Sequence, residues 1–310
     1  MELIRGLHNL RQKHKSCVAT IGNFDGMHPG HLDILRQVKN HGRIHNLPSV
    51  VIIFEPQPLE YLLAEQAPER LSSLREKLRL LTEQDIDRVL CLTFNQQLKS
   101  LSAQDFIDIL LVEKLAIECF IIGDDFRFGH DRCGDFNLLQ KVGQQQGFKV
   151  IRSPTYCIDG ERVSSTRIRK ALQKHNFALI KKLSGRPFTI SGKVIRGQQL
   201  GQHMGIPTAN IKLAGSRSVL QGVFATRVHG LAAQPLTSIS NIGYRPTIST
   251  TSQAQLEVHL FDFNDNLYGK VIQVEFCKYI RPERYFSNID LLRQQIDEDI
   301  NQAKAYFNNI

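Results

Sequence analysis

The chain lacks any long apolar segment, and this absence excludes one large class of proteins. No stretch of its 310 residues approaches the roughly 20 consecutive apolar residues that a membrane-spanning helix needs. The first residues, MELIRGLHNLRQKHKS, are also too polar for a signal peptide. We therefore expect a cytoplasmic protein with no membrane partner.

Paired cysteines are missing as well. The six cysteines form no CxxC pair, and no neighbouring cysteines have the spacing of metal ligands. Dispersed thiols in a chain of this size are typical of reduced cysteines in a cytosolic protein. These residues are Cys17, Cys91, Cys119, Cys133, Cys157 and Cys277.

The sequence has no block of like charge, although 39 Lys and Arg outnumber 30 Asp and Glu and give a net charge of +9. A basic chain favours anionic partners, and both nucleic acid and nucleotide phosphates are candidates. Because the charge is spread along the chain, it singles out no RNA-binding patch. We therefore expect small phosphorylated molecules rather than nucleic acid as partners.

The length suits two domains, and the first 180 residues alternate short apolar runs with helical patterns. The nearly continuous apolar run SVVIIF is typical of a strand that is covered on both faces. Repeated strand-then-helix units predict an α/β domain with a Rossmann-like parallel sheet. The five strand-like runs are CVATIG, SVVIIF, RVLCLTF, IECFIIG and FKVIRS.

The pattern changes near residue 184, where long helices give way to short β-rich runs between Gly and Pro turns. Closely spaced runs of this kind predict an antiparallel β-barrel. An amphipathic helix in NIDLLRQQIDEDINQAKAYF follows and is expected to pack on the barrel. We therefore expect domains over residues 1–184 and 185–310.

The stretch GNFDGMHPGH, residues 22–31, places two histidines at a strand-to-helix turn. Unsatisfied N–H groups and the positive end of the helix dipole make such a turn an anion site. Gly30 would let a phosphate approach the backbone, and His28 and His31 would donate hydrogen bonds to phosphate oxygens. A zinc site is a weaker interpretation, because it needs a third protein ligand. A catalytic triad lacks an exposed nucleophile on a matching turn.

Three further stretches follow at the ends of later strands: FEPQP (54–58), GDDFRFGHDRCG (123–134) and VSSTRIR (163–169). Together with GNFDGMHPGH they resemble the HxGH nucleotidyltransferases, and specifically the bacterial bifunctional riboflavin kinase/FAD synthetase family. The resemblance covers essentially the whole chain. It implies that the first domain joins the adenylyl group of ATP to the phosphate of FMN, forming FAD and releasing pyrophosphate.

The resemblance also implies roles for individual residues of the first domain. His28 and His31 would act in catalysis by contacting the ATP phosphates. The ATP and phosphate site would comprise Asn23, Phe24, Asp25, Gly26, His28, Gly30, His31, Ser164, Ser165, Thr166 and Arg169. The cleft for flavin and nucleotide would be lined by Phe54, Pro56, Asp124, Phe126 and Arg127.

The second domain opens with a glycine-rich stretch, GQQLGQHMGIPTANI (197–211), that lacks the GK[ST] element of a Walker loop. Thr208 and Asn210 offer the hard oxygen ligands that suit Mg²⁺ bound with substrate phosphates. The stretch resembles the riboflavin kinase signature G-x-PTAN, and SNIGYRPTI and LEVHLFDFNDNLYG fit the same domain. The expected ATP site of the kinase is Gly192, Gly197, Gly201, Gly205, Pro207, Thr208 and Asn210.

In the family that the chain resembles, the glutamate at the position of Glu257 is the catalytic base. It would take the proton from the ribityl 5′-hydroxyl of riboflavin as that oxygen attacks the γ-phosphate of ATP. From the residues alone, Glu257 between Leu256 and Val258 fits a plain solvent-facing strand position equally well.

Two positions depart from the family pattern. Gln57 stands where the family commonly has His, so we expect no catalytic role for it. Gln202 stands where the family has Arg in the glycine-rich loop, and this change bears on ATP affinity rather than on the reaction type.

These patterns predict a bifunctional, Mg²⁺-dependent enzyme that phosphorylates riboflavin to FMN and then adenylylates FMN to FAD. One alternative is a single-activity HxGH nucleotidyltransferase that acts on another phosphorylated metabolite, although PTAN and Glu257 argue against it. A second alternative is a basic RNA-binding barrel, which would need aromatic residues interleaved with basic ones on its strands. GVFATRVHG supplies only one such aromatic residue.

Overall fold

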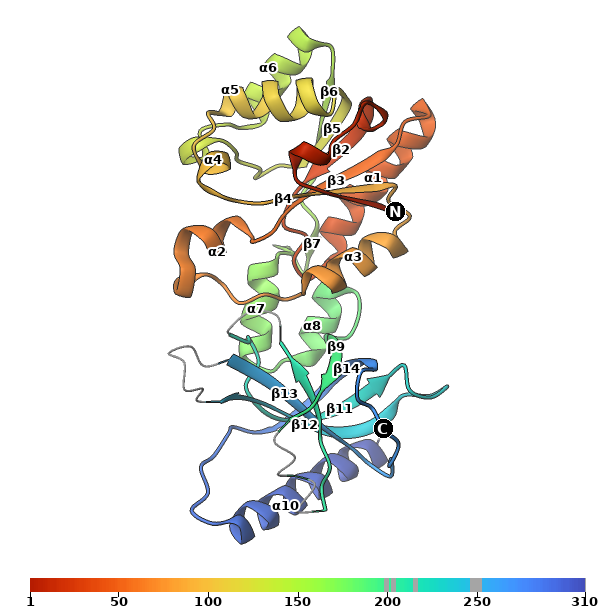
Figure 1. Ribbon diagram of the computed structural model, residues 1–310, viewed down its shortest axis with the longest axis vertical. Coiled ribbons are helices and arrows are strands. Elements are labelled where there is room, and N and C mark those ends of the chain that lie inside the picture. The colour runs from red at the N-terminus through yellow and green to blue at the C-terminus, as the bar shows by residue number, and fades with distance from the viewer. Residues whose placement is uncertain (198–200, 202–204, 214–216, 246–252, 310) are drawn as a thin grey trace. The chain divides into compact units, whose positions relative to one another are not determined.

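The structure, a computed structural model shown in Figure 1, describes residues 1–197, 201, 205–213, 217–245 and 253–309. The contacts between residues divide the chain into two units. One unit comprises Met1–Pro68 and Ser73–Ser164, and the other comprises Glu69–Ser72 and Ser165–Ile310. Among the described helices, none is long and apolar enough to cross a bilayer.

A six-stranded parallel sheet forms the centre of the first unit, which confirms the α/β prediction. The strand order β1-β4-β3-β2-β5-β6 reverses direction next to β2. The sequence patterns do not predict the edge strand β1, because it is only four residues long and buries only Ile4. The strands are β1 (Glu2–Arg5), β2 (Cys17–Ile21), β3 (Ser49–Phe54), β4 (Arg88–Leu92), β5 (Ile117–Gly123) and β6 (Lys149–Ser153).

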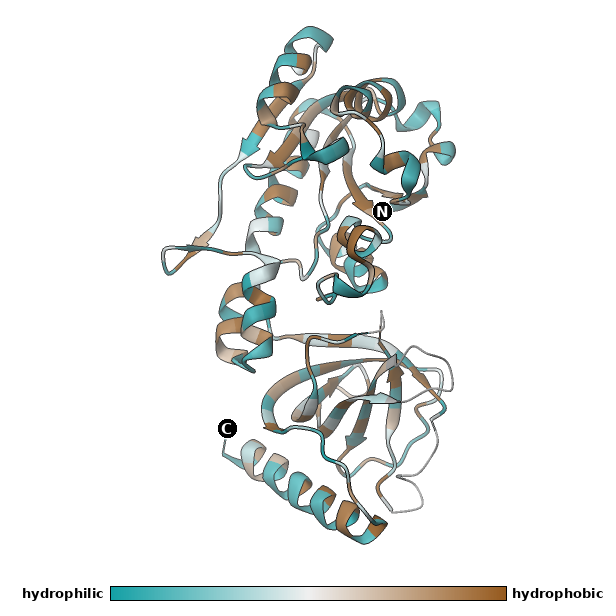
Figure 2. Ribbon diagram, turned by 90° about the vertical axis from the view of Figure 1, so that its left-hand side faces the viewer, coloured by the Kyte–Doolittle hydropathy of each residue, from teal (hydrophilic) through white to brown (hydrophobic). Residues whose placement is uncertain are grey.

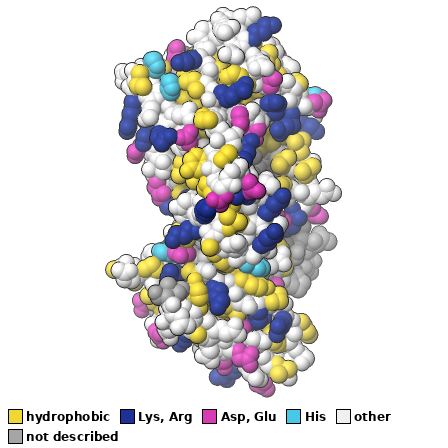
Figure 3. Space-filling model, turned by 180° about the vertical axis from the view of Figure 1, so that it is seen from behind, with side chains coloured by type: hydrophobic (Ala, Val, Ile, Leu, Met, Phe, Trp, Pro, Cys, Tyr) yellow, Lys and Arg dark blue, Asp and Glu magenta, His cyan; other side chains and the backbone are white. Residues whose placement is uncertain are grey.

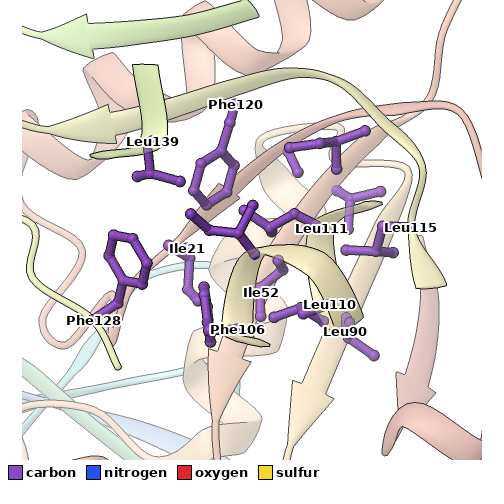
Figure 4. Close-up of a cluster of buried hydrophobic side chains, with 14 of the residues drawn as sticks. Ile21, Ile52, Leu90, Phe106, Leu110, Leu111, Leu115, Phe120, Phe128 and Leu139 are labelled. Atoms are coloured by element: carbon purple, nitrogen blue, oxygen red, sulfur yellow. The ribbon is translucent and has the colours of Figure 1, made fainter. Parts of the chain in front are cut away.

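Helices cover both faces of this sheet. Alternate residues of a strand point to opposite faces, and because the central strands are apolar on both faces, each face needs a helical cover. On one face, Ile21 and Ile52 pack against Leu110 and Leu139, as Figure 4 shows. On the other face, Val51 joins a separate cluster with residues of α1 and α3. The helical segments are η1 (Leu7–Asn9), η2 (Gln12–His14), α1 (Pro29–His45), α2 (Pro58–Leu63), η3 (Ala64–Gln66), α3 (Leu74–Glu83), α4 (Gln96–Lys99), α5 (Ala103–Asp105), the π-helical η4 (Phe106–Lys114), η5 (His130–Arg132) and α6 (Phe136–Gln146).

A closed antiparallel barrel forms the second unit, which confirms the second fold prediction. Its strands follow the order β10-β13-β12-β11-β14-β9 around the barrel. The PTAN stretch runs into β10, where Ala209, Asn210 and Ile211 are all buried. The strands are β9 (Thr189–Ile195), β10 (Ala209–Lys212), β11 (Gly222–His229), β12 (Leu236–Arg245), β13 (Gln253–Leu260) and β14 (Val271–Arg281).

The terminal helix α10 (Ile289–Asn308) packs on the outside of the barrel as predicted, with Ala303 buried beside Val223 and Ile239. Figure 2 shows hydrophilic and hydrophobic residues alternating along it. Arg281 of β14 donates three hydrogen bonds, 2.7 to 2.9 Å long, to the carboxylate of Asp299, which is 2% exposed. A bidentate pair in this setting fixes the helix against the strand.

Helices α7 (Ser165–Gln173) and α8 (Phe177–Ser184) belong to the barrel unit. The ring of His175, between the two helices, stacks on Tyr279 of β14 with 3.8 Å between ring centroids. Phe177 meets Phe224 of β11 edge to face at 6.2 Å. These contacts explain why residues 165–184, which the sequence assigns to the first domain, cluster with the barrel. A short hairpin, β7 (Cys157–Ile158) and β8 (Glu161–Arg162), precedes α7.

Candidate active sites

The reversal of strand order next to β2 marks the first candidate site. In open α/β sheets, ligands bind beyond the carboxyl ends of the strands where the order reverses. Strand β2 pairs with β3 on one side and with β5 on the other. The segments that leave β2 and β5 at these ends carry the GNFDGMHPGH and GDDFRFGH sequences.

The two histidines of the first segment form one stacked pair. His28 is the N-cap of α1, and its Nδ1 accepts a hydrogen bond from the backbone N–H of His31 at 3.4 Å. The two rings are stacked with 3.6 Å between centroids and 17° between planes. Because Nδ1 of His28 is the acceptor, its proton is assigned to Nε2, which can donate to a phosphate oxygen.

Burial keeps both imidazoles neutral. His28 is 7% exposed, and desolvation, followed by the charge of Arg162, lowers its pKa to about 4. The pKa of His31 is held well below its usual 6.5, mainly by burial and then by His28, Lys77 and Arg162. Near pH 7 the pair therefore offers N–H donors and no positive charge.

Gly30 makes room for the ring of His28. A Cβ atom at Gly30 would lie 3.3 Å from two atoms of that ring and 3.4 Å from the Cβ of Tyr156. Phe24 and Asp25 are 1% and 2% exposed, and the ring of Phe24 lies 5.1 Å from that of His31. Phe24 therefore supports the histidine pair from the hydrophobic core, while Asn23 and Gly26 lie at the partly exposed surface of the turn.

The cleft residues predicted from FEPQP lie where β3 ends and are partly exposed. The ring of Phe54 meets Phe94 edge to face at 5.8 Å, and Tyr61 of α2 meets Phe94 at 5.7 Å. Pro56 is half-buried, and Gln57 is the N-cap of α2 with 7% of its surface exposed. These side chains form an aromatic cluster at the edge of the sheet.

The residues predicted from GDDFRFGH follow β5. Phe126 stacks on Phe128 with 5.4 Å between centroids, and Phe128 belongs to the hydrophobic core. Asp124 accepts a hydrogen bond from Thr155 and lies 3.7 Å from the guanidinium of Arg162. Arg127 is exposed and donates to the carbonyl oxygen of Phe126.

Sequence reasoning missed two cations of this site. Arg162 of β8 pairs with Asp125 at 2.7 Å and lowers the pKa of both histidines. Lys77 of α3 is 1% exposed and lowers the pKa of His31. The position of Arg162, directly before VSSTRIR, was a possible signal. No sequence pattern identifies Lys77 as a buried residue of the site, because a lysine on an amphipathic helix usually faces solvent.

The VSSTRIR residues straddle the two units. Ser164 ends the first unit, whereas Ser165, Thr166 and Arg169 begin α7 in the second. Nε of Arg169 donates to the carbonyl oxygen of Glu69 at 2.6 Å, and Thr166 is exposed. That these residues meet the phosphates held by His28 and His31 stays a prediction.

The second candidate site lies on the outer face of the barrel. Glu257 of β13 is half-buried and directly opposes Asn210 of β10 and Asn241 of β12. Its neighbours Leu256 and Val258 are completely buried, so the three polar residues share the opposite face. Nδ2 of Asn241 donates to Glu283 at 3.1 Å.

Asn210 is held by its neighbours on three sides. Its Oδ1 accepts from Gln255 at 2.7 Å, and its Nδ2 donates to the carbonyl oxygen of Thr208 at 3.3 Å. A Cβ atom at Gly197 would lie 2.5 Å from the Asn210 amide, so a side chain at this position would require the amide to move. Thr208 itself is half-buried and precedes β10.

The other glycines of the predicted kinase site have different surroundings. A Cβ atom at Gly192 would lie 2.3 Å from Ile211, and one at Gly201 would lie 2.3 Å from the carbonyl oxygen of Ile206. Gly205 has a positive φ of 77° and open space around it. The carbonyl of Pro207 contacts Nδ1 of His259 at 2.8 Å. Gln202 lies outside the described residues.

The donor atoms near Asn210 fit Mg²⁺ only as part of a larger ligand set. The described residues contain no cluster of three His, Cys, Asp or Glu that could hold a metal ion. Thr208 and Asn210 provide neutral oxygens two positions apart, and Glu257 provides a carboxylate in register with Asn210. This set suits a cation that receives most of its ligands from substrate phosphates and water.

Comparisons with known proteins match both halves of the chain. The family model for FAD synthetase matches residues 10–167, and that for riboflavin kinase matches residues 184–307. The bifunctional riboflavin kinase/FMN adenylyltransferase of Escherichia coli K12 is 49% identical over 308 residues, 99% of this chain and 98% of that protein. The protein of that name from Pseudomonas fluorescens is 46% identical over 98% of this chain and 97% of its own length. A macrolide-efflux protein from Streptococcus pneumoniae has a crystal structure that superposes with a TM-score of 0.78, at 27% identity, over 98% of this chain and 99% of that chain.

Proposed function

The chain belongs to the bifunctional riboflavin kinase/FMN adenylyltransferase family, and we propose that the His28–His31 turn and the Glu257 strand carry its two reactions. The protein phosphorylates riboflavin to FMN with ATP and joins FMN to the adenylyl group of a second ATP to give FAD. One observation supports the assignment of the two sites. The first unit contains a stacked, neutral histidine pair, and the barrel contains a separate polar face around Glu257.

In the adenylyl transfer, a phosphate oxygen of FMN attacks the α-phosphorus of ATP and pyrophosphate leaves. His28 and His31 donate hydrogen bonds to the phosphate oxygens, where negative charge grows in the transition state. Their lowered pKa values make both side chains neutral N–H donors near pH 7. Ser164, Ser165, Thr166 and Arg169 hold the departing pyrophosphate, because Arg offers a fork of donors for phosphate.

In the kinase reaction, Glu257 takes the proton of the riboflavin 5′-hydroxyl as its oxygen attacks the γ-phosphorus of ATP. Thr208 and Asn210 would contact the phosphates and hold Mg²⁺, and the ion would neutralise charge on the transferred group. Gly197 leaves the space that the Asn210 amide needs, and Gln255 fixes the orientation of that amide. We assign the first reaction site to residues 1–184 and the second to residues 185–310.

Small phosphorylated molecules account for the basic character of the chain. On the face seen in Figure 3, Lys and Arg side chains are interspersed with Asp and Glu rather than gathered in one stripe. A nucleic-acid groove would require such a stripe. We therefore propose ATP, riboflavin and FMN as the partners and the cytoplasm, where these occur, as the location.

A time course tests the assignment. Purified protein with riboflavin, ATP and Mg²⁺ should form FMN first and FAD later, as separated by chromatography. Supplying FMN in place of riboflavin should give FAD with no lag. Formation of FMN without any FAD, or of FAD only from added FMN, would overturn the bifunctional assignment.

A further inference from the structure

The C-terminal end of α1 carries two further histidines, His41 and His45, which neither proposed reaction uses (Figure 1). Residues four positions apart lie on one face of a helix, one turn above each other. The two rings are nearly parallel, with 13° between their planes and 6.2 Å between their centroids. Because both rings project from the same face, their nitrogen atoms can reach one metal ion through bonds of about 2.0 to 2.1 Å.

The ring of His41 is unprotonated near neutral pH, as a metal ligand must be. Burial, followed by the charges of Lys149 and His45, lowers the pKa of His41 below its ordinary 6.5. Its Nδ1 atom is buried and has no hydrogen-bond partner among the residues that the structure describes. No hydrogen bond at this atom therefore fixes the tautomer, and Nε2 can carry the lone pair that a metal ion needs.

The position at the end of the helix favours a cation. The carboxyl end of a helix carries about half a negative charge, and His45 is the last residue of α1. His45 is exposed and His41 partly exposed, so an ion can reach this face from solvent. Lys149, at the start of β6, opposes a cation here, but its side chain is exposed and its charge is screened by water and salt.

The ligand atoms select the kind of ion. Imidazole nitrogen suits Zn²⁺, Ni²⁺ and Cu²⁺, whereas Mg²⁺ and Ca²⁺ prefer oxygen ligands. Within the part of the chain that the structure describes, no third His, Cys, Asp or Glu completes a metal-binding cluster with this pair. The site therefore has two protein nitrogens and leaves the other coordination positions to water, and it differs in chemistry from the Mg²⁺ site expected in the barrel.

We propose that His41 and His45 together bind one late first-row divalent transition-metal ion, such as Ni²⁺ or Zn²⁺, at the carboxyl end of α1. Water completes the coordination of the ion. The ion joins two successive turns of the helix and stabilises the folded first unit, because the two rings are held together only in the folded chain. Neither flavin reaction uses this ion.

Calorimetric titration of the untagged, metal-free full chain with Ni²⁺, and then with Zn²⁺, measures affinity and stoichiometry. His41→Gln and His45→Gln should each weaken binding by at least about tenfold, because even loss of a hydrogen bond that orients a metal ligand costs about 10- to 100-fold in affinity. Lys149→Gln should strengthen binding about two- to fivefold, since exposed charges repel only weakly through water. Ni²⁺ should raise the Tm of wild type but not that of the double variant His41→Gln/His45→Gln.

His130→Gln is the matched control, because His130 is an exposed histidine outside α1 that pairs with Asp131. It should bind Ni²⁺ as wild type does. Wild-type affinity in the double variant would overturn the proposal and assign the ion to other side chains. A loss in only one of the two single variants would overturn the chelate, because one histidine alone would then hold the ion. Absence of binding heat and of a Tm shift in wild type would remove the site altogether.

Discussion

Glu257 of β13 is the direct cross-strand partner of Asn210 of β10. Their side chains share the outer face of the barrel, since directly opposed residues of paired strands point to the same side. This relationship joins two sequence motifs that are far apart in the chain, PTAN and LEVHLFDF. It places a carboxylate beside the amide that we propose to hold the phosphates and Mg²⁺.

Replacing Glu257 by Gln should abolish FMN formation from riboflavin. The amide keeps the size of the side chain but cannot take a proton, and general bases contribute about 10²- to 10⁴-fold to rate. FAD formation from added FMN should stay at the wild-type rate, which also shows that the chain is folded. The measurement is the initial rate of each reaction. Equal loss of both activities in folded protein would contradict two separate sites.

Replacing His31 by Ala should have the reverse effect. It removes one donor from the stacked pair, and loss of one donor to a transition-state oxyanion costs about 10²- to 10³-fold in rate. FMN formation should continue unchanged, because His31 lies in the first unit. Both rates are measured with saturating ATP. Full FAD synthesis in this variant would remove His31 from the mechanism.

Replacing Gly197 by Ala should impair the kinase without affecting adenylyl transfer. The new methyl group would lie 2.5 Å from the Asn210 amide and would force it away from Gln255. We expect at least about a tenfold loss in kcat/KM for riboflavin phosphorylation, since misplacing a positioning group is costly. The rate of FAD formation from FMN is the internal control. A wild-type kinase rate would show that the position of the Asn210 amide is not critical.

The low pKa of His28 makes the stability of the first unit depend on pH. In the unfolded chain a histidine titrates near 6.5, whereas burial first and Arg162 second lower the pKa in the folded chain to about 4. As pH falls below 6.5, the unfolded state binds a proton that the folded state does not bind. The contribution of His28 to the free energy of unfolding is therefore fully present above pH 6.5. It decreases by about 3 kcal/mol as the pH falls from 6.5 to 4.

The measurement compares urea unfolding of wild type and His28→Gln at pH 7 and pH 5. The neutral variant should lose about 2 kcal/mol less between these pH values than wild type does. His45→Gln, at the exposed end of α1, is the control and should behave like wild type. An equal pH dependence in wild type and His28→Gln would show that folding does not lower the pKa of His28.

Breaking the pair between Arg281 and Asp299 should destabilise the barrel unit. Asp299 is 2% exposed, so Arg281→Met would leave a carboxylate buried without its cation. Loss of one partner of a buried pair costs about 3 to 5 kcal/mol. Thermal unfolding followed by circular dichroism measures the effect, with the exposed Arg284→Met as the control. A melting temperature equal to that of wild type would mean that the pair contributes nothing.

Much of the fold could be predicted because its signals are local. The apolar runs SVVIIF and IECFIIG predicted strands whose observed bounds match the runs. Strand β1 was missed because a short edge strand is recognised mainly by its partner, β4. The clustering of α7 and α8 with the barrel has no local signal in the sequence, because it depends on the stacking of His175 on Tyr279.

The sequence by itself determined the two motifs, the two kinds of domain and the family, because spacing and residue type are enough to mark a phosphate-binding turn and a kinase signature. Only the tertiary structure decided that His28 and His31 are stacked and neutral, since a pKa depends on burial and on charges distant in sequence. It also brought Arg162 and Asp125 together from separate elements. These contacts arise when the chain folds, so they cannot be read from the order of the residues.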